Sequence, residues 1–141
     1  MNFIFAFILF ALLTVNAAPF QLSKRAITFG SCGDAHEPIP LLNVKIGTNP
    51  PESEKSESFE VSGKVTKVDI PDQATINIVY FDNDRKNLGN YFKTFNETIK
   101  AGTPFKISLS DVPTPRLPHS YELKVYVDDE STLACANAIV G

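Results

Sequence analysis

The chain has few of the residues on which enzymes and metal sites depend. It contains two cysteines, two histidines and no tryptophan in 141 residues. There is no Cys-x-x-Cys pair, and two cysteines alone do not complete a zinc site. His36 and His119 each lie near a proline in loop sequence, with no third ligand or nucleophile motif beside them. We therefore expect no bound metal, no cofactor and no catalytic residue.

Basic clusters are also absent. The formal net charge is −3, from 13 Lys and Arg against 16 Asp and Glu. Binding to nucleic acid requires Lys and Arg to neutralise the phosphates, so this charge argues against a nucleic-acid partner. It also argues against strong electrostatic docking on an anionic membrane. The length suits one domain with a sizeable core, and not two.

The one long apolar run lies at the N-terminus, over residues 3–15. It is shorter than the roughly 18–20 apolar residues that span a bilayer as a helix. Small residues then precede a cleavage point after Ala17, so residues 1–17 are predicted to be a signal peptide. A membrane-anchored N-terminus is the alternative. Lys24-Arg25 marks either a processing site, which would make residues 18–25 a propeptide, or two solvated charges in a linker; in both cases the domain covers residues 26–141.

Helical patterning is missing after the leader, where no window of ten or more residues has helical spacing and caps. Short segments instead alternate apolar and polar residues, which is typical of strands with one buried face. Proline-rich stretches at 48–58 and 111–119 are expected to be loops. About seven or eight strands separated by Pro and Gly turns predict an all-β, immunoglobulin-like β-sandwich. The expected strands are 26–32, 41–46, 59–65, 74–81, 88–99, 105–109, 121–128 and 133–140.

The expected interior is large and rich in aromatic residues. Residues 74–81 are apolar on both faces, which indicates a central strand, or one beside a cavity or a partner. If Asn96 points outward, Tyr91 and Phe95 point inward, which brings Lys93 to the inner side, either at a rim or at a break in register. Pattern alone favours a filled core over an apolar ligand cavity between the sheets. The side chains that would line such a cavity are Phe59, Val61, Ile76, Ile78, Tyr80, Tyr91, Phe95, Phe105, Ile107, Tyr121, Leu123 and Val125.

Secretion would place the cysteines in an oxidising compartment. Cys32 and Cys135, an isolated pair near opposite ends of one small domain, then predict a single disulfide. Closing a loop of about a hundred residues is worth roughly 4–5 kcal/mol in the chain-entropy description. Asn96-Glu97-Thr98 is the one N-glycosylation sequon, and its use would place Asn96 on the solvent side of its strand.

The C-terminal residues carry a resemblance to a known family. Leu117-Pro118-His119-Ser120-Tyr121, the alternation through Asp128-Asp129, and Leu133-Ala134-Cys135 resemble the ends of the fungal phosphatidylglycerol/phosphatidylinositol transfer proteins. These belong to the ML lipid-recognition family, as does the Niemann–Pick cholesterol carrier. The leader, the early cysteine and the Pro-rich turns fit the same pattern over residues 26–141.

The resemblance implies a non-catalytic lipid-binding and transfer protein. Its two sheets would splay to hold the acyl chains of a phospholipid, or a sterol, with the headgroup near Lys93, Tyr91 or the 111–119 loop. It also implies pairing of Cys32 with Cys135, transient membrane contact by a monomer, and a place outside the cell or in the vacuolar or lysosomal lumen. Animal members carry further disulfides, so the rim loops of this chain should be looser.

Two other functions are compatible with the residues. A secreted immunoglobulin-like interaction or adhesion module would have the same strands around a filled core. A small β-sandwich hydrolase would depend on His36 or His119.

Overall fold

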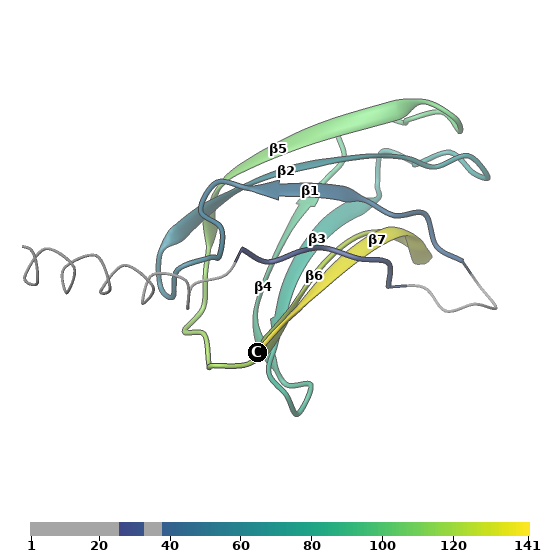
Figure 1. Ribbon diagram of the computed structural model, residues 1–141. Coiled ribbons are helices and arrows are strands. Elements are labelled where there is room, and N and C mark those ends of the chain that lie inside the picture. Colours follow the sequence, from purple (N-terminus) through teal and green to yellow (C-terminus); the bar gives the residue numbers. More distant parts are fainter. Residues whose placement is uncertain (1–25, 33–37) are drawn as a thin grey trace, which may run out of the picture.

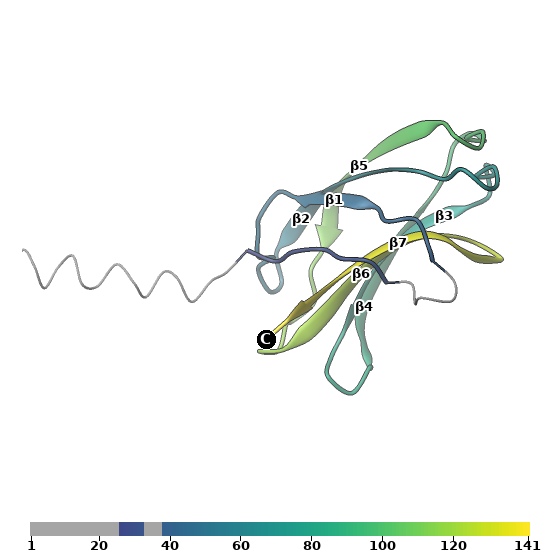
Figure 2. The same cartoon turned by 45° about the vertical axis from the view of Figure 1, so that its right-hand side comes forward.

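The computed structural model describes residues 26–32 and 38–141; the predicted leader, residues 18–25 and His36 lie outside the described part. Seven strands form two antiparallel sheets that face each other (Figure 1, Figure 2). No helix in the described part is long and apolar enough to cross a membrane. In chain order the strands are β1 (Asn43–Ile46), β2 (Ser56–Lys64), β3 (Thr75–Phe81), β4 (Asn87–Thr94), β5 (Pro104–Pro113), β6 (Tyr121–Asp129) and β7 (Ser131–Val140).

The two sheets differ in size. The smaller has the order β1-β2-β5 and the larger the order β4-β3-β6-β7. The predicted all-β, immunoglobulin-like sandwich is therefore confirmed. The segment that is apolar on both faces forms β3, which lies between β4 and β6 as expected for a central strand.

Alternation along the strands places one face of each sheet in the interior. On β6, Tyr121, Leu123, Val125 and Val127 are buried, and the residues between them are half-buried. On β3 even the outward-facing Val79 is only 6% exposed, because strands flank it on both sides. Full burial of a side chain of this size contributes roughly 1.5–3 kcal/mol. The buried residues of both sheets form one apolar cluster.

Three strand boundaries differ from the prediction by three residues or more, and pairing explains each difference. β2 begins at Ser56 and β5 continues to Pro113 because these two residues pair at the end of their shared ladder. The loops predicted at 48–58 and 111–119 are correspondingly shorter. β4 ends at Thr94 and not near residue 99, because its partner β3 begins at Thr75, the residue that pairs with Thr94.

Residues 26–32 were expected to form the first strand, and they do not form a regular one. They make a single bridge to β7, in which the N–H and C=O of Gly30 bond to Asn137 at 2.7 and 2.9 Å. Leu41 then pairs in parallel with Cys135 on the same edge. Because two separate segments share this edge, neither builds a continuous ladder. Together they cover part of a strand edge on which another chain can otherwise pair.

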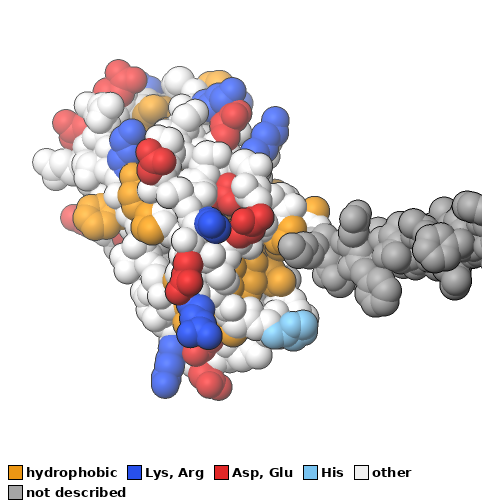
Figure 3. Space-filling model, turned by 90° about the vertical axis from the view of Figure 1, so that its left-hand side faces the viewer, with side chains coloured by type: hydrophobic (Ala, Val, Ile, Leu, Met, Phe, Trp, Pro, Cys, Tyr) orange, Lys and Arg blue, Asp and Glu red, His pale blue; other side chains and the backbone are white. Residues whose placement is uncertain are grey.

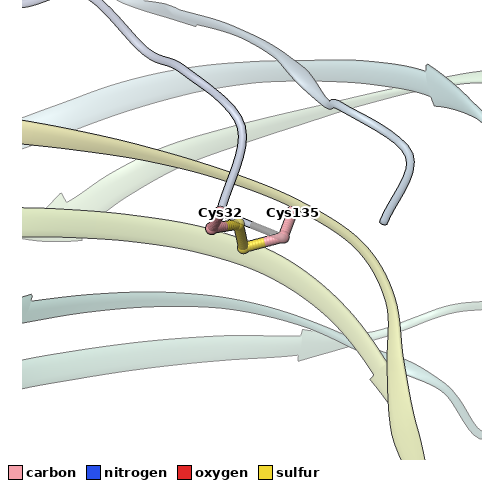
Figure 4. Close-up of a disulfide and its surroundings, with 2 residues drawn as sticks. All are labelled: Cys32 and Cys135. Carbon is pink, nitrogen blue, oxygen red and sulfur yellow. A yellow bond between two sulfur atoms is a disulfide. The ribbon is translucent and has the colours of Figure 1, made fainter. Parts of the chain in front are cut away.

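The predicted disulfide between Cys32 and Cys135 is confirmed (Figure 4). Cys135 is opposite Tyr126 in the β6–β7 ladder, on the face turned away from Ala134 and Ala136, which belong to the core. It is nevertheless only 1% exposed. The segment that carries Cys32 lies beside β7 (Figure 1), to which it is bonded through Gly30.

Candidate functional site

The predicted cavity-lining residues converge on the space between the two sheets. They come from β2 and β5 on one side and from β3, β4, the residue after β4 and β6 on the other. Ten of the twelve are buried, and Tyr91 and Ile107 are half-buried. All pack in the one apolar cluster. These side chains thus occupy most of the space between the sheets. Two pockets lie at opposite ends of the strands.

The first hollow, which we call the β4–β5 pocket, lies between the two sheets and has a volume of about 490 Å³. β4 and β5 are edge strands of different sheets, so no backbone ladder joins them. Phe95 and Phe105 meet edge to face across this gap, with ring centroids 6.0 Å apart. The pocket is lined by Ile76, Lys93, Thr94, Phe95, Asn96, Glu97, Ile99, Thr103, Pro104, Phe105, Lys106, Ile107 and Ser108.

The rim of the β4–β5 pocket carries positive charge. Lys93 pairs with the buried Ile76 in an unbroken part of the ladder and is itself exposed, so it is a rim residue and not a sign of broken register. Lys106 Nζ lies 2.9 Å from a carboxylate oxygen of Glu60, and this hydrogen bond lowers the pKa of Glu60. Among the described residues, Lys93 has no such acidic partner. It is therefore available to an anionic group at the mouth.

The second hollow, which we call the loop-end pocket, is larger, at about 840 Å³. It lies between the β1–β2 loop, the β5–β6 loop and the C-terminal residues. Figure 3 views the molecule from this side, where hydrophobic side chains gather near a histidine. The pocket is lined by Thr48, Asn49, Pro50, Pro51, Glu52, Ser53, Leu117, Pro118, His119, Tyr121, Val140 and Gly141.

The two pockets lie at opposite ends of the strands. The start of β5 lines the first, and the loop that follows β5 lines the second. The residues predicted to meet a headgroup are therefore separated: Lys93 lies at the β4–β5 pocket, and Leu117 to His119 lie at the loop-end pocket. Tyr91 lines neither of these two pockets and packs against the core.

Asn96 of the sequon is exposed, beyond the end of β4, on the rim of the β4–β5 pocket. A glycan at this position would therefore stand beside the mouth. Elsewhere in residues 26–32 and 38–141, no group of three or more His, Cys, Asp or Glu side chains has the arrangement of a metal site.

A buried polar cluster lies near the loop-end pocket, and the sequence pattern does not predict it. Glu57, which is 4% exposed, accepts hydrogen bonds from the backbone N–H groups of Thr48 and Ser58 at 2.7 and 3.1 Å. Tyr80 and Thr114 are buried nearby, and burial raises the pKa of Tyr80 far above its ordinary value. Glu57 and Thr114 were both placed in loops. Only the pairing that extends β2 and β5 brings them inside.

No known protein-family profile matches the chain, and no curated protein sequence matches it. Among solved structures, two β-glucuronidases, one from glycoside hydrolase family 2 and one from Bacteroides uniformis, match with TM-scores of 0.45 and 0.44 at 17% and 16% identity. The matches cover 77% and 70% of this chain but only 12% of each enzyme.

A structural match with a higher TM-score extends over most of both chains. It is the crystal structure of chicken MD-1 complexed with lipid IVa, with a TM-score of 0.52 at 15% identity. The match covers 82% of this chain and 88% of that one. At this identity the likeness concerns the fold: the chain has a β-sandwich similar to that of chicken MD-1.

Proposed function

We propose that this protein binds a lipid without catalysing a reaction and transfers it between membranes. The observation that carries the proposal is the β4–β5 pocket, an opening between the sheets with an apolar floor and the unpaired cation Lys93 on its rim. An amphipathic ligand matches both parts. The likeness of the fold to a protein crystallised with lipid IVa adds support.

The gap between β4 and β5 is the side on which the sandwich can open at least cost. Side chains close it, chiefly Phe95 against Phe105, whereas backbone hydrogen bonds hold each sheet together. The backbone bonds that cross nearby, between Ile70 and Ile99, lie in the loops. An acyl chain that separates the two rings replaces their contacts with its own, at about 0.8 kcal/mol for each buried methylene. Most of the binding free energy would therefore come from the chain and not from the headgroup.

Lys93 would interact with the headgroup. An exposed ion pair contributes only about 0–1 kcal/mol, because solvent and salt screen it. Lys93 therefore tunes the preference among headgroups, with a phosphate favoured, and does not supply the affinity. A phospholipid such as phosphatidylglycerol or phosphatidylinositol fits this arrangement, and a sterol would use the apolar floor alone.

Blocking the pocket tests the proposal. Wild-type protein is expected to carry bound lipid in native mass spectrometry and to move a fluorescent phospholipid between vesicles. Ile107→Trp adds bulk at the half-buried floor and should reduce both signals strongly. Ile139→Trp, at a position that is 78% exposed, is the matched control and should leave both unchanged. A wild-type protein that carries no lipid and transfers none would contradict the proposal.

The second candidate is a secreted interaction module with a filled core. The burial of ten of the twelve interior residues favours it. For this candidate, the purified protein would be free of lipid and Ile107→Trp would change neither uptake nor transfer. Both candidates enter the secretory pathway through the predicted leader, in keeping with the disulfide.

A further inference from the structure

Two connections cross between the sheets at the end that holds the β4–β5 pocket, and they are bonded to each other. Residues 65–74 lead from β2 to β3, and residues 95–103 lead from β4 to β5. They lie at the same end because β2 pairs with β5 as far as Lys64, where the first connection begins, and β3 pairs with β4 from Thr75, where it ends. We call the two connections together the strap.

Backbone hydrogen bonds hold the strap together. The N–H groups of Ile70 and Ile99 each donate to the carbonyl of the other at 2.8 Å, and the Gly102 N–H donates to the Val65 carbonyl at the same distance. Ile70 and Val65 are 1% and 4% exposed, whereas Ile99 lines the β4–β5 pocket. The part of the pocket wall that Ile99 forms is therefore fastened to buried residues of the connection between β2 and β3.

One exposed side chain adds to these backbone bonds. Asp69 Oδ1 accepts a hydrogen bond from the Ala101 N–H at 2.8 Å, and its Oδ2 lies 3.6 Å from Lys100 Nζ. A hydrogen bond to a charged acceptor is stronger than one between neutral groups, whereas an ion pair as exposed as this one contributes little. The bond to Ala101 is therefore the main contribution of Asp69 to the strap.

The paired strap limits how far the sheets can separate at the pocket. β4 and β5 share no backbone ladder, and the edge-to-face contact of Phe95 with Phe105 closes the gap between them. A ligand that enters must part these two rings, and the connection that joins β4 to β5 must then lengthen or shift. Hydrogen bonds to residues 65–70 hold that connection in place, so some of them must break before the pocket opens.

We propose that Asp69 is the latch of the strap, a positioning residue that sets how fast lipid enters and leaves the β4–β5 pocket. The inference rests on the proposed function and adds the control of ligand exchange at the same site. Asp69 does not line the pocket, so it acts through the wall and not on the ligand. Loss of the latch lowers the cost of opening for the empty and for the loaded protein alike. Both exchange rates therefore rise, while the equilibrium affinity, which compares two latched states, changes little.

The first test compares Asp69→Ala with Asp72→Ala, which makes the same charge change in the same connection. Asp72 is exposed, and its carboxylate makes no hydrogen bond or ion pair with the described residues. Stopped-flow fluorescence follows pyrene-labelled phosphatidylglycerol from phosphatidylcholine vesicles to the protein and back. We expect Asp69→Ala to raise both rate constants about fivefold, the factor for one lost hydrogen bond, with the dissociation constant within about twofold of wild type. Asp72→Ala should match the wild type in all three.

A reversible crosslink across the strap should have the opposite effect. Ile70→Cys combined with Ile99→Cys places two thiols at directly opposed, hydrogen-bonded positions, where Cα atoms lie about 5.5 Å apart, within the range of a disulfide. The oxidised form should take up the same lipid at least about tenfold more slowly than the reduced form of the same variant. Wild-type protein in the same reducing agent controls for reduction of the bond between Cys32 and Cys135.

The outcomes separate the latch from lipid binding itself. Equal exchange rates in Asp69→Ala and Asp72→Ala would overturn the latch and leave lipid binding standing, as would equal uptake by the oxidised and reduced forms of the cysteine pair. Weaker binding by Asp69→Ala without faster exchange would likewise overturn it, because damage to the wall alone explains that result. If the cysteine pair fails to fold, the comparison of the two aspartate variants decides. A wild-type protein that takes up no lipid would contradict both proposals.

Discussion

Cys32 and Cys135 join the chain before the first strand to the last strand across 103 residues, with Cα atoms 6.0 Å apart. The bond lies on the outer face of β7, beside the edge on which Gly30 and Leu41 also pair. The segment is held on β7 by this bond, by the hydrogen bonds of Gly30, and by the packing of Ile27 and Phe29 against the core.

Replacing Cys32 and Cys135 with alanine should lower the free energy of unfolding by up to about 4–5 kcal/mol, because the unfolded chain is no longer constrained by the long loop. Urea unfolding monitored by far-ultraviolet circular dichroism measures the loss. Wild-type protein in reducing agent is the matched control and should behave like the double variant. Equal midpoints for the oxidised wild type and the variant would show that the bond contributes little.

The two faces of the larger sheet should respond differently to truncation. Leu123→Ala removes a fully buried side chain and should cost about 2–5 kcal/mol. Ile139→Ala, on the same sheet but 78% exposed, should be nearly neutral. Denaturant midpoints at unchanged m-value provide the comparison. Similar losses for the two variants would contradict the side-chain directions described above.

Lys93→Glu should weaken binding of phosphatidylglycerol by about two- to fivefold, as expected for loss of an exposed charge interaction. Binding of phosphatidylcholine should hardly change, and the difference should shrink in high salt. Lys86→Glu makes the same charge change in the β3–β4 turn, away from the pocket lining. If both variants weaken binding equally, net charge and not the rim position of Lys93 is responsible.

Stability should fall as the pH rises above about 10. Burial raises the pKa of Tyr80 in the folded protein above its ordinary value of 10.0. Well below pH 10 this tyrosine is neutral in both states, and its contribution is complete. At higher pH the unfolded chain releases the proton first, so unfolding becomes more favourable.

Tyr80→Phe should make this decline shallower without abolishing it, since burial also raises the pKa of Tyr121 and Tyr126. Free energies of unfolding measured between pH 8 and 11 give the slope, with Tyr91→Phe as the control. An unchanged slope in Tyr80→Phe would contradict the proposed role of its burial.

A glycan on Asn96 should slow lipid uptake, because this residue lies on the rim of the β4–β5 pocket. Intact mass before and after enzymatic removal of N-glycans reports its presence, and Asn96→Gln provides the unmodified protein. Uptake should be faster after removal and should match that of Asn96→Gln. Glycosylated and deglycosylated protein taking up lipid at the same rate would refute this effect.

Features of this fold that depend on local alternation could be predicted from the sequence. Period-two patterns identified the buried faces of β3 and β6, and the apolar character of both faces of 74–81 identified the central strand. The misfit of Lys93 indicated either a rim position or a break in register, and the structure places the residue at a rim. These predictions are correct because burial of one strand face requires apolar and polar residues to alternate along the strand.

Features that depend on pairing between segments far apart in the sequence could not be predicted from local patterns. The extension of β2 and β5 follows from the pairing of Ser56 with Pro113, and it brings Glu57 and Thr114 out of expected loops and into the interior. Residues 26–32 have a strand-like pattern, yet they make a single bridge to β7, at Asn137. Leu41 pairs with Cys135 on the same edge of β7, so the ladder does not continue.

By itself, the sequence determined the fold class, the buried faces and the cysteine pair, since each is set by residue type and spacing along the chain. Only the tertiary structure decided that the two pockets lie at opposite ends of the strands and that Glu57 and Thr114 are buried beside Tyr80. Those features form where loops and sheet edges from distant parts of the chain come into contact. Tertiary packing determines these contacts, and the residues of any one short segment do not predict them.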